Sequence, residues 1–301
     1  MEIISVEKIK PTLPTPPHLR IHNISLLDQM MYGAYVAAVL YFFGNDSGDR
    51  IQHLKDSLSQ TLVTLYPFVG VIRDALSADC NDEGLPFSVT KVMKVQMRDF
   101  LQNPNLELIK KFLPGGYSQK KPPGPGDSVM LIQLNCFDCG GIAMCISFYH
   151  IIADLASVSM FLQHWAANAR GLGFAHVSSL NCVAQSFFPQ NPSLPTDLIP
   201  FKNFVKYLRV GNSVMRRYVF DASALSVLKP QLSTSQVSAV SAMIWKCFME
   251  VVAEEGMKPV LMTHSVNLRR QASPPFSDDS FGNLVSRLNF SKDRITRFDC
   301  D

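Results

Sequence analysis

Residues 142–165 read IAMCISFYHIIADLASVSMFLQHW, and this stretch decides the fold. Its first eight residues place large apolar side chains at every second position, as a half-buried β-strand does. From Leu155 onward the apolar residues recur every three or four positions, which is typical of the buried face of a helix. A strand therefore passes directly into a helix, and His150 lies at the junction.

Other segments repeat one of these two patterns. The apolar run Tyr32–Phe43 is too short to span a bilayer and predicts a buried strand. Strands or helices are also indicated at residues 3–9, 51–65, 87–97, 129–135, 237–253 and 260–266. This alternation of strands and helices predicts a mixed α/β protein.

The chain is long enough for more than one domain, with 301 residues of which 47% are hydrophobic. Several prolines between residues 181 and 200 are typical of a crossover between domains. We therefore predict an N-terminal domain at residues 1–180, a linker at 181–205 and a C-terminal domain at 206–301.

Composition and charge argue against several classes of function. The net charge is only +3, and the basic run that a nucleic-acid-binding protein normally concentrates on one face is absent. Charged residues interrupt the apolar N-terminus, so we recognise no signal peptide. We therefore expect a cytoplasmic monomer that binds neither nucleic acid nor membrane.

The seven cysteines are expected to be free thiols, because their number is odd and no secretion signal precedes them. Cys136 and Cys139 form an isolated C-x-x-C at the end of a predicted strand, without the further ligands of a metal site. We favour two unbonded cysteines over metal or redox use, and we predict no metal.

His150 and Asp154 form an H-x-x-x-D pattern that suits acyl transfer. An alcohol is a poor nucleophile until a base takes its proton, and imidazole, which ordinarily titrates near pH 6.5, is the side chain suited to that task. By itself the pattern is weak, since about 0.3 matches are expected by chance. A single histidine at such a junction is more often structural.

Several segments, in order, resemble those of the plant BAHD acyltransferases. They are Ser25-Leu26-Leu27-Asp28-Gln29, Tyr66-Pro67-Phe68-Val69-Gly70, Cys80-Asn81-Asp82-Glu83-Gly84, Gly140-Gly141 before the H-x-x-x-D pattern, Ala242-Met243-Ile244-Trp245-Lys246, Asn267-Leu268-Arg269 and Phe281-Gly282-Asn283. Each segment is short, but the ordered set is specific. Ile152-Ala153-Asp154, followed by Leu155 where many members have glycine, resembles the vinorine-synthase-like subgroup.

The resemblance implies a chloramphenicol-acetyltransferase-like fold, in which two α/β domains enclose a channel. It implies that His150 is the general base and that Asp154 orients the site by pairing with Arg269. Asp154 could instead be a carboxylate that simply favours a helix N-terminus, and both roles can hold together.

The family's contacts with CoA lie before its I-W-K helix, which here implicates Ser235, Ser238 and also Lys229. Hydroxyls and backbone N–H groups at a helix start are natural ligands for phosphate. Ser235 could equally be a simple helix cap, and Lys229 could be merely solvated.

The family's D-F-G-W-G segment is absent from the sequence after Asn283. The resemblance therefore predicts a C-terminally truncated member whose second domain is incomplete. One hypothesis is an acyltransferase; the alternative is a catalytically inactive relative that only binds other molecules.

The predicted enzyme moves an acyl group, with acetyl favoured, from acyl-CoA as co-substrate to a hydroxyl or amine of a plant specialised metabolite such as an alkaloid or terpenoid. It uses no permanently bound cofactor and forms no acyl-enzyme. A thiol hydrolase based on Cys145 and His150 is disfavoured, because Cys145 lies in mid-strand.

Overall fold

The computed structural model describes residues 1–44, 48–115, 123–173, 180–195, 216–228, 235–254 and 260–292. The chain forms two compact units. The first comprises Met1–Val210 together with Asn267–Val285, and the second comprises Gly211–Val266 together with Ser286–Asp301. Residues 267–285 therefore pack with the first unit, although the chain enters the second unit before reaching them.

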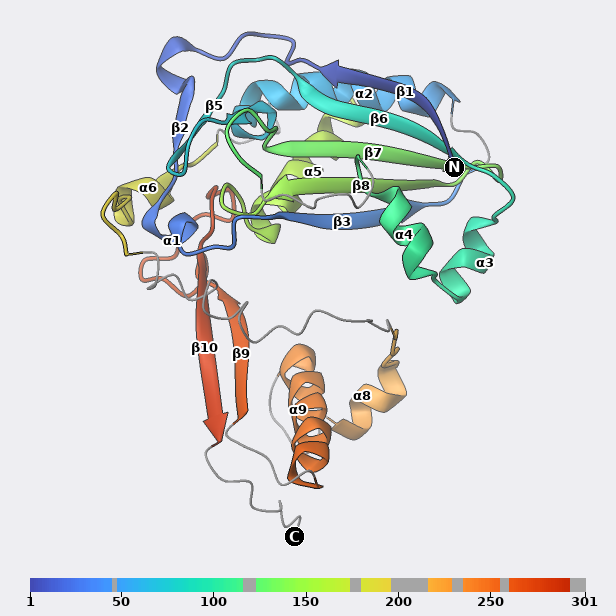
Figure 1. Cartoon of the computed structure of the whole chain (residues 1–301), viewed down its shortest axis with the longest axis vertical. Helices are drawn as coiled ribbons and strands as arrows, with labels where there is room; N and C mark the ends of the chain where they lie inside the picture. The colour runs from blue at the N-terminus through green and yellow to red at the C-terminus, as the bar shows by residue number, and fades with distance from the viewer. Residues whose placement is uncertain are drawn as a thin grey trace. The chain divides into compact units, whose positions relative to one another are not determined.

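A mixed five-stranded sheet forms the centre of the first unit (Figure 1). Its strands, in spatial order, are β1 (Glu2–Ile9), β6 (Leu85–Val92), β7 (Met130–Phe137), β8 (Ile142–Tyr149) and β3 (Tyr35–Phe42). β6 and β7 run parallel, and the other neighbouring pairs are antiparallel. Every residue of β8 is buried, because the strand has a neighbour on each side and is covered on both faces.

β3 corrects the prediction of a buried strand at Tyr32–Phe43. The strand is present, but it lies at the edge of the sheet, where Val36 and Phe42 are 38% and 40% exposed. An apolar run shows that residues fit a pleated surface and does not distinguish an inner strand from an edge strand. The prediction of burial is therefore wrong.

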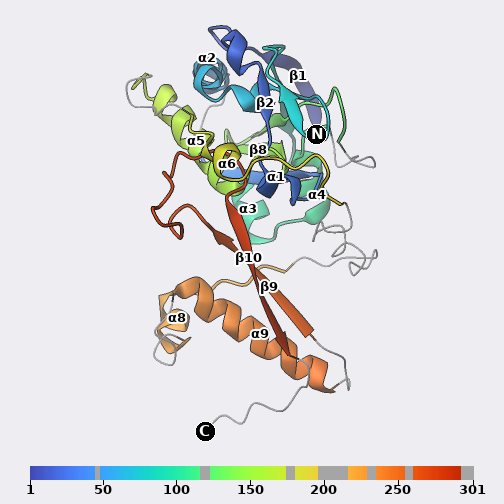
Figure 2. The same cartoon turned by 90° about the vertical axis from the view of Figure 1, so that its left-hand side faces the viewer.

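Helices cover both faces of this sheet, as Figure 2 shows. The helices α2 (Gly48–Thr64) and α5 (Leu155–Ala169) pack on one face, and α3 (Met97–Gln102) and α4 (Leu106–Phe112) pack on the other. The Trp165 indole of α5 donates a hydrogen bond to the Leu54 carbonyl of α2 at 3.0 Å, which links the two longer helices. α5 is thereby fixed on the sheet, and its N-terminus is fixed with it.

Short elements complete the first unit. A second, antiparallel sheet contains β2 (Ile21–Asn23), β5 (Ser77–Asp79) and β4 (Val71–Ile72) in that order. The other elements are the helices α1 (Leu26–Gln29) and α6 (Val183–Phe187) and the 3-10 turns Pro17–Leu19 and Tyr66–Val69.

The second unit contains α8 (Ala222–Leu228), α9 (Gln236–Glu254) and the two-stranded sheet of β9 (Val260–Asn267) and β10 (Val285–Lys292). α9 and β9 agree with the helix predicted at 237–253 and the strand predicted at 260–266. Within the described part of the chain, no helix has both the length and the hydropathy needed to cross a bilayer.

Candidate active site

His150 occupies a tight turn between β8 and α5, and it is partly exposed. Its backbone N–H donates to the Ala34 carbonyl just before β3, at 3.0 Å. Two residues later in the turn, the Ile152 N–H donates to the Tyr149 carbonyl at 2.9 Å. The residue is thus attached to two neighbouring strands while its ring remains accessible.

The ring of His150 has a defined tautomer. Its Nδ1 lies 3.2 Å from the Ala153 carbonyl oxygen. A carbonyl oxygen can only accept a hydrogen bond, so Nδ1 is the donor, and in the neutral ring Nε2 then keeps the lone pair. Among the described residues, no hydrogen-bond partner faces Nε2. A neutral imidazole in this form can accept a proton at Nε2.

Asp154 caps the N-terminus of α5. Its Oδ1 accepts hydrogen bonds from the Ser157 backbone N–H at 2.8 Å and from the Ser157 hydroxyl at 2.9 Å. The carboxylate is almost completely buried, with a residue exposure of 3%. A buried carboxylate at this depth needs further compensation, since an unpaired charge is costly to remove from water.

Arg269 supplies that compensation. Its Nη1 lies 2.7 Å from Asp154 Oδ2 and its Nη2 lies 3.1 Å from Asp154 Oδ1, which is a bidentate ion pair. The guanidinium is 1% exposed and also donates to the Ser280 and Gly282 carbonyls. The sequence-predicted partners therefore lie together, and Asp154 makes the helix-capping interaction and the ion pair at the same time.

A second buried polar side chain, that of Asn283, contacts the turn that carries His150, and sequence reasoning missed its role. The Asn283 amide Nδ2 lies 2.8 Å from the His150 carbonyl, 3.3 Å from the Ile151 carbonyl and 2.8 Å from Asp28 Oδ1. The Asn283 backbone N–H donates to the same Asp28 oxygen at 2.7 Å. Gly282, with φ of +106°, allows this approach, because residues with a side chain rarely adopt that conformation.

Asp28 accepts the hydrogen bonds that hold Asn283 in place. It lies in α1, where it forms a capping box with Ser25, and it is completely buried. Burial raises the pKa of the Asp28 carboxyl, while the hydrogen bonds from Ser25 and Asn283 act to lower that pKa. The Ser25-x-x-Asp28 and Gly282-Asn283 segments therefore meet behind the His150 turn. Their place in the ordered set of family segments was the one signal in the sequence that marked them.

Aromatic side chains pack around Phe281, the residue that precedes Gly282-Asn283. Phe281 is fully buried and meets the Phe68 ring and the His22 ring edge-on, with ring centroids 5.2 Å apart in each case. Burial lowers the pKa of His22 to about 4, so this imidazole is neutral in the folded protein near pH 7.

Acidification should destabilise the protein through His22. Its pKa is about 4 when folded and 6.5 in the reference state, so the unfolded chain binds more protons between those pH values. The free energy of unfolding therefore falls by about 3 kcal/mol as pH drops through this window. We expect urea unfolding of His22→Gln to show a weaker pH dependence, and His18→Gln, which changes an exposed histidine, to keep the wild-type dependence. Identical pH dependence in wild type and His22→Gln would contradict this assignment.

The predicted CoA-binding residues fall in the second unit. The Ser235 hydroxyl oxygen accepts from the Ser238 N–H at 3.1 Å at the start of α9, and both residues are exposed. This is the interaction of a helix cap. Lys229 lies outside the described residues.

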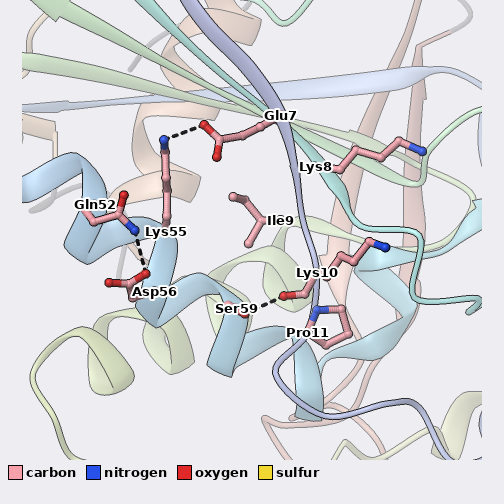
Figure 3. Close-up of a pocket in the computed structure, with 9 residues that line it drawn as sticks. All are labelled: Glu7, Lys8, Ile9, Lys10, Pro11, Gln52, Lys55, Asp56 and Ser59. Atoms are coloured by element: carbon pink, nitrogen blue, oxygen red, sulfur yellow. Dashed lines mark hydrogen bonds and ion pairs between the residues drawn. The ribbon is translucent and has the colours of Figure 1, made fainter.

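Two other features in the described part of the first unit do not suggest chemistry. A pocket of about 340 Å³ lies between β1 and α2 (Figure 3). Within it, Lys55 pairs with Glu7 and Gln52 donates to Asp56, so these four polar side chains satisfy one another. Cys145 is buried in β8 and burial raises its pKa to about 12, which argues further against a thiol nucleophile.

The likeness to known proteins covers nearly the whole chain. A model described as the Transferase family matches residues 1–295. The chain belongs to this family, the BAHD transferases. The assignment made from the ordered sequence segments is therefore confirmed.

Relatives of this BAHD protein include named plant acetyltransferases. Epi-neemfruitin B 7-O-acetyltransferase of Melia azedarach is 36% identical over 96% of this chain and 68% of its own length. Salutaridinol 7-O-acetyltransferase of Papaver somniferum is 34% identical over 94% of this chain and 65% of its own length. The chain thus spans roughly two thirds of these relatives.

The fold of this BAHD protein is also found in solved structures. The crystal structure of vinorine synthase matches with a TM-score of 0.83 and 29% identity, over 99% of this chain and 72% of that chain. A protein of F. sporotrichioides complexed with coenzyme A and T-2 matches with a TM-score of 0.68 and 17% identity, over 91% of this chain and 69% of that chain. The predicted fold class is confirmed.

Proposed function

We propose that this chain transfers an acyl group from an acyl-CoA to a hydroxyl or amine of a plant specialised metabolite, with His150 as the general base. The observation that carries the proposal is the His150 ring, whose Nδ1 faces the Ala153 carbonyl at 3.2 Å. That contact leaves the Nε2 lone pair free to accept a proton from the acceptor.

The reaction needs one base and no covalent intermediate on the protein. Nε2 takes the proton of the acceptor O–H, and the acceptor oxygen attacks the thioester carbonyl carbon. The tetrahedral intermediate collapses as the carbon–sulfur bond breaks, and the departing thiolate takes the proton back from the imidazolium. The products are an ester and CoA, or an amide and CoA when the acceptor is an amine.

Asp154 and Arg269 position this base and take no part in moving the proton. Both Asp154 oxygens already face donors from Ser157 and Arg269. The pair instead fixes the start of α5, and with it the Ala153 carbonyl that selects the tautomer of His150. A buried bidentate pair is suited to such a rigid role.

The names of the relatives support a choice of acyl group and acceptor class. Proteins more than 30% identical to this chain are named limonoid 7-O-acetyltransferase, salutaridinol 7-O-acetyltransferase and stemmadenine O-acetyltransferase. We propose acetyl-CoA as donor and a terpenoid or alkaloid alcohol as acceptor, with Ser235, Ser238 and Lys229 as candidate contacts for CoA.

The expressed chain should release free thiol from acetyl-CoA only when an acceptor alcohol is present. Because no acyl-enzyme forms, initial rates measured against both substrates should give the intersecting lines of a ternary complex. A panel of terpenoid and alkaloid alcohols, with mass detection of the acetylated product, tests this directly.

Two results would count against the proposal. Parallel lines, together with an acetylated chain after incubation with acetyl-CoA alone, would indicate an acyl-enzyme instead. Binding of acetyl-CoA without thiol release for the whole panel would support the inactive, purely binding alternative.

A further inference from the structure

The turn that carries His150 has two main-chain carbonyls directed at one side chain. The His150 and Ile151 carbonyls lie 2.8 Å and 3.3 Å from Asn283 Nδ2. A buried carbonyl without a donor costs free energy, so the position of these two peptides depends on this amide.

The orientation of the Asn283 amide follows from its surroundings. Three acceptors face Nδ2: the two carbonyls and Asp28 Oδ1. A flipped amide would bring its oxygen against all three, which no arrangement of hydrogens could satisfy. The buried Oδ1 has no partner among the described residues, which is consistent with an amide held from its nitrogen side alone.

Asp28 anchors this amide to a different part of the fold. One of its oxygens accepts from both the backbone and the side chain of Asn283, and the other accepts from the Ser25 N–H and hydroxyl, each at 2.7 Å. The carboxylate is therefore held by four donors, and the Asn283 amide has little freedom to move.

We propose that Asn283, held by Asp28, is a positioning residue for the His150 imidazole; this inference rests on the proposed role of His150 as the base. The residue His150 is then fixed at three points. Its N–H meets the Ala34 carbonyl, its carbonyl meets Asn283, and its ring meets the Ala153 carbonyl. Loss of the contact with Asn283 lets the backbone at His150 rotate, and the ring then loses its contact with the Ala153 carbonyl.

The Asn283→Ala variant tests the proposal. A base displaced by about 1 Å can lose on the order of 100-fold in rate. We expect kcat to fall by about that factor while the KM for acetyl-CoA changes little, because the lost contacts orient the base and are not contacts to substrate.

Asn135→Ala provides a matched control. Asn135 is equally buried, and its Nδ2 also donates to two main-chain carbonyls, those of Phe112 and Ala143. Loss of these bonds should lower stability to a similar degree, but it should leave kcat close to wild type. An equal fall in kcat for both variants would mean that Asn283 acts only on the stability of the fold.

The ¹⁵N signals of the imidazoles give a readout that needs no catalysis. The His150 signal is the one that His150→Ala removes. Wild type should show a protonated Nδ1, and Asn283→Ala should shift the tautomer toward protonated Nε2. If His150→Ala proves fully active, the proposed function fails, but this signal still reports whether Asn283 positions the ring.

Asp28→Asn tests the anchor in case Asn283→Ala does not fold. This variant removes the charge and replaces one carboxylate oxygen by an NH2 donor. When the remaining oxygen accepts from Asn283, that NH2 group faces the Ser25 N–H and hydroxyl, so the Asn283 amide is held more weakly. We expect a smaller loss of kcat and a tautomer shift in the same direction. The proposal is overturned if Asn283→Ala folds and keeps both the wild-type kcat and the wild-type imidazole signal. It is equally overturned if Asp28→Asn folds and leaves both unchanged.

Discussion

Replacing His150 by alanine is expected to lower kcat/KM by roughly 10²- to 10⁴-fold, the usual contribution of a positioned general base. The remaining activity would come from orientation of the two substrates alone. The loss should appear mainly in kcat, since the base acts on the acceptor proton in the transition state. Thiol release measured under saturating acetyl-CoA provides the measurement.

His53→Ala is the matched control for this experiment. His53 is an exposed histidine of α2 whose Nε2 also meets a main-chain carbonyl, that of Ala169. Its removal should leave kcat/KM unchanged. Because His150 is partly exposed, added imidazole should restore part of the activity of His150→Ala. An unchanged rate in His150→Ala would exclude the general-base mechanism.

Replacing Arg269 by methionine is expected to reduce the free energy of unfolding by about 3–5 kcal/mol, as the loss of one partner in a buried ion pair generally does. Asp154 would keep only its Ser157 donors at an exposure of 3%. The Ser280 carbonyl would also lose its donor, and the Gly282 carbonyl would keep only its contacts with Ser157 and Leu284. Urea unfolding with a fixed m-value provides the measurement.

The neighbouring arginine is a suitable control. Arg270 pairs with Asp278 at 2.7 Å, but the two side chains are 79% and 66% exposed. Arg270→Met should therefore hardly move the unfolding midpoint. Asp154→Asn combined with Arg269→Met should recover part of the loss, because asparagine still caps α5 and no buried charge remains. Equal effects of Arg269→Met and Arg270→Met on the free energy of unfolding would show that the buried pair stabilises the protein no more than the exposed pair.

Local periodicity predicted the centre of the first unit well. The strand expected at 142–149 is β8, and the helical stripe after Asp154 is α5. Both patterns depend on neighbours that are close in sequence. The order of strands in the sheet, and the edge position of β3, depend on pairing between distant segments, which periodicity does not record.

The site shows the same limit. His150 and Asp154 lie four residues apart, so their spacing marked them as candidates, and the ordered family segments gave this pattern its weight. Arg269 could be assigned to Asp154 only through the resemblance to a family, because 115 residues separate the two. The bonds from Asn283 to Asp28 span 255 residues, and no pattern in the sequence predicted them.

That long span has a consequence for protein synthesis. The ribosome releases the strand, the turn and the helix around His150 well before it has made Asn283. Until then the two carbonyls of that turn lack their amide donor, and Asp28 lacks two of its four donors. Contacts this distant along a chain form late in folding. A nascent chain halted before residue 283 would therefore hold its imidazole in a loosely ordered loop.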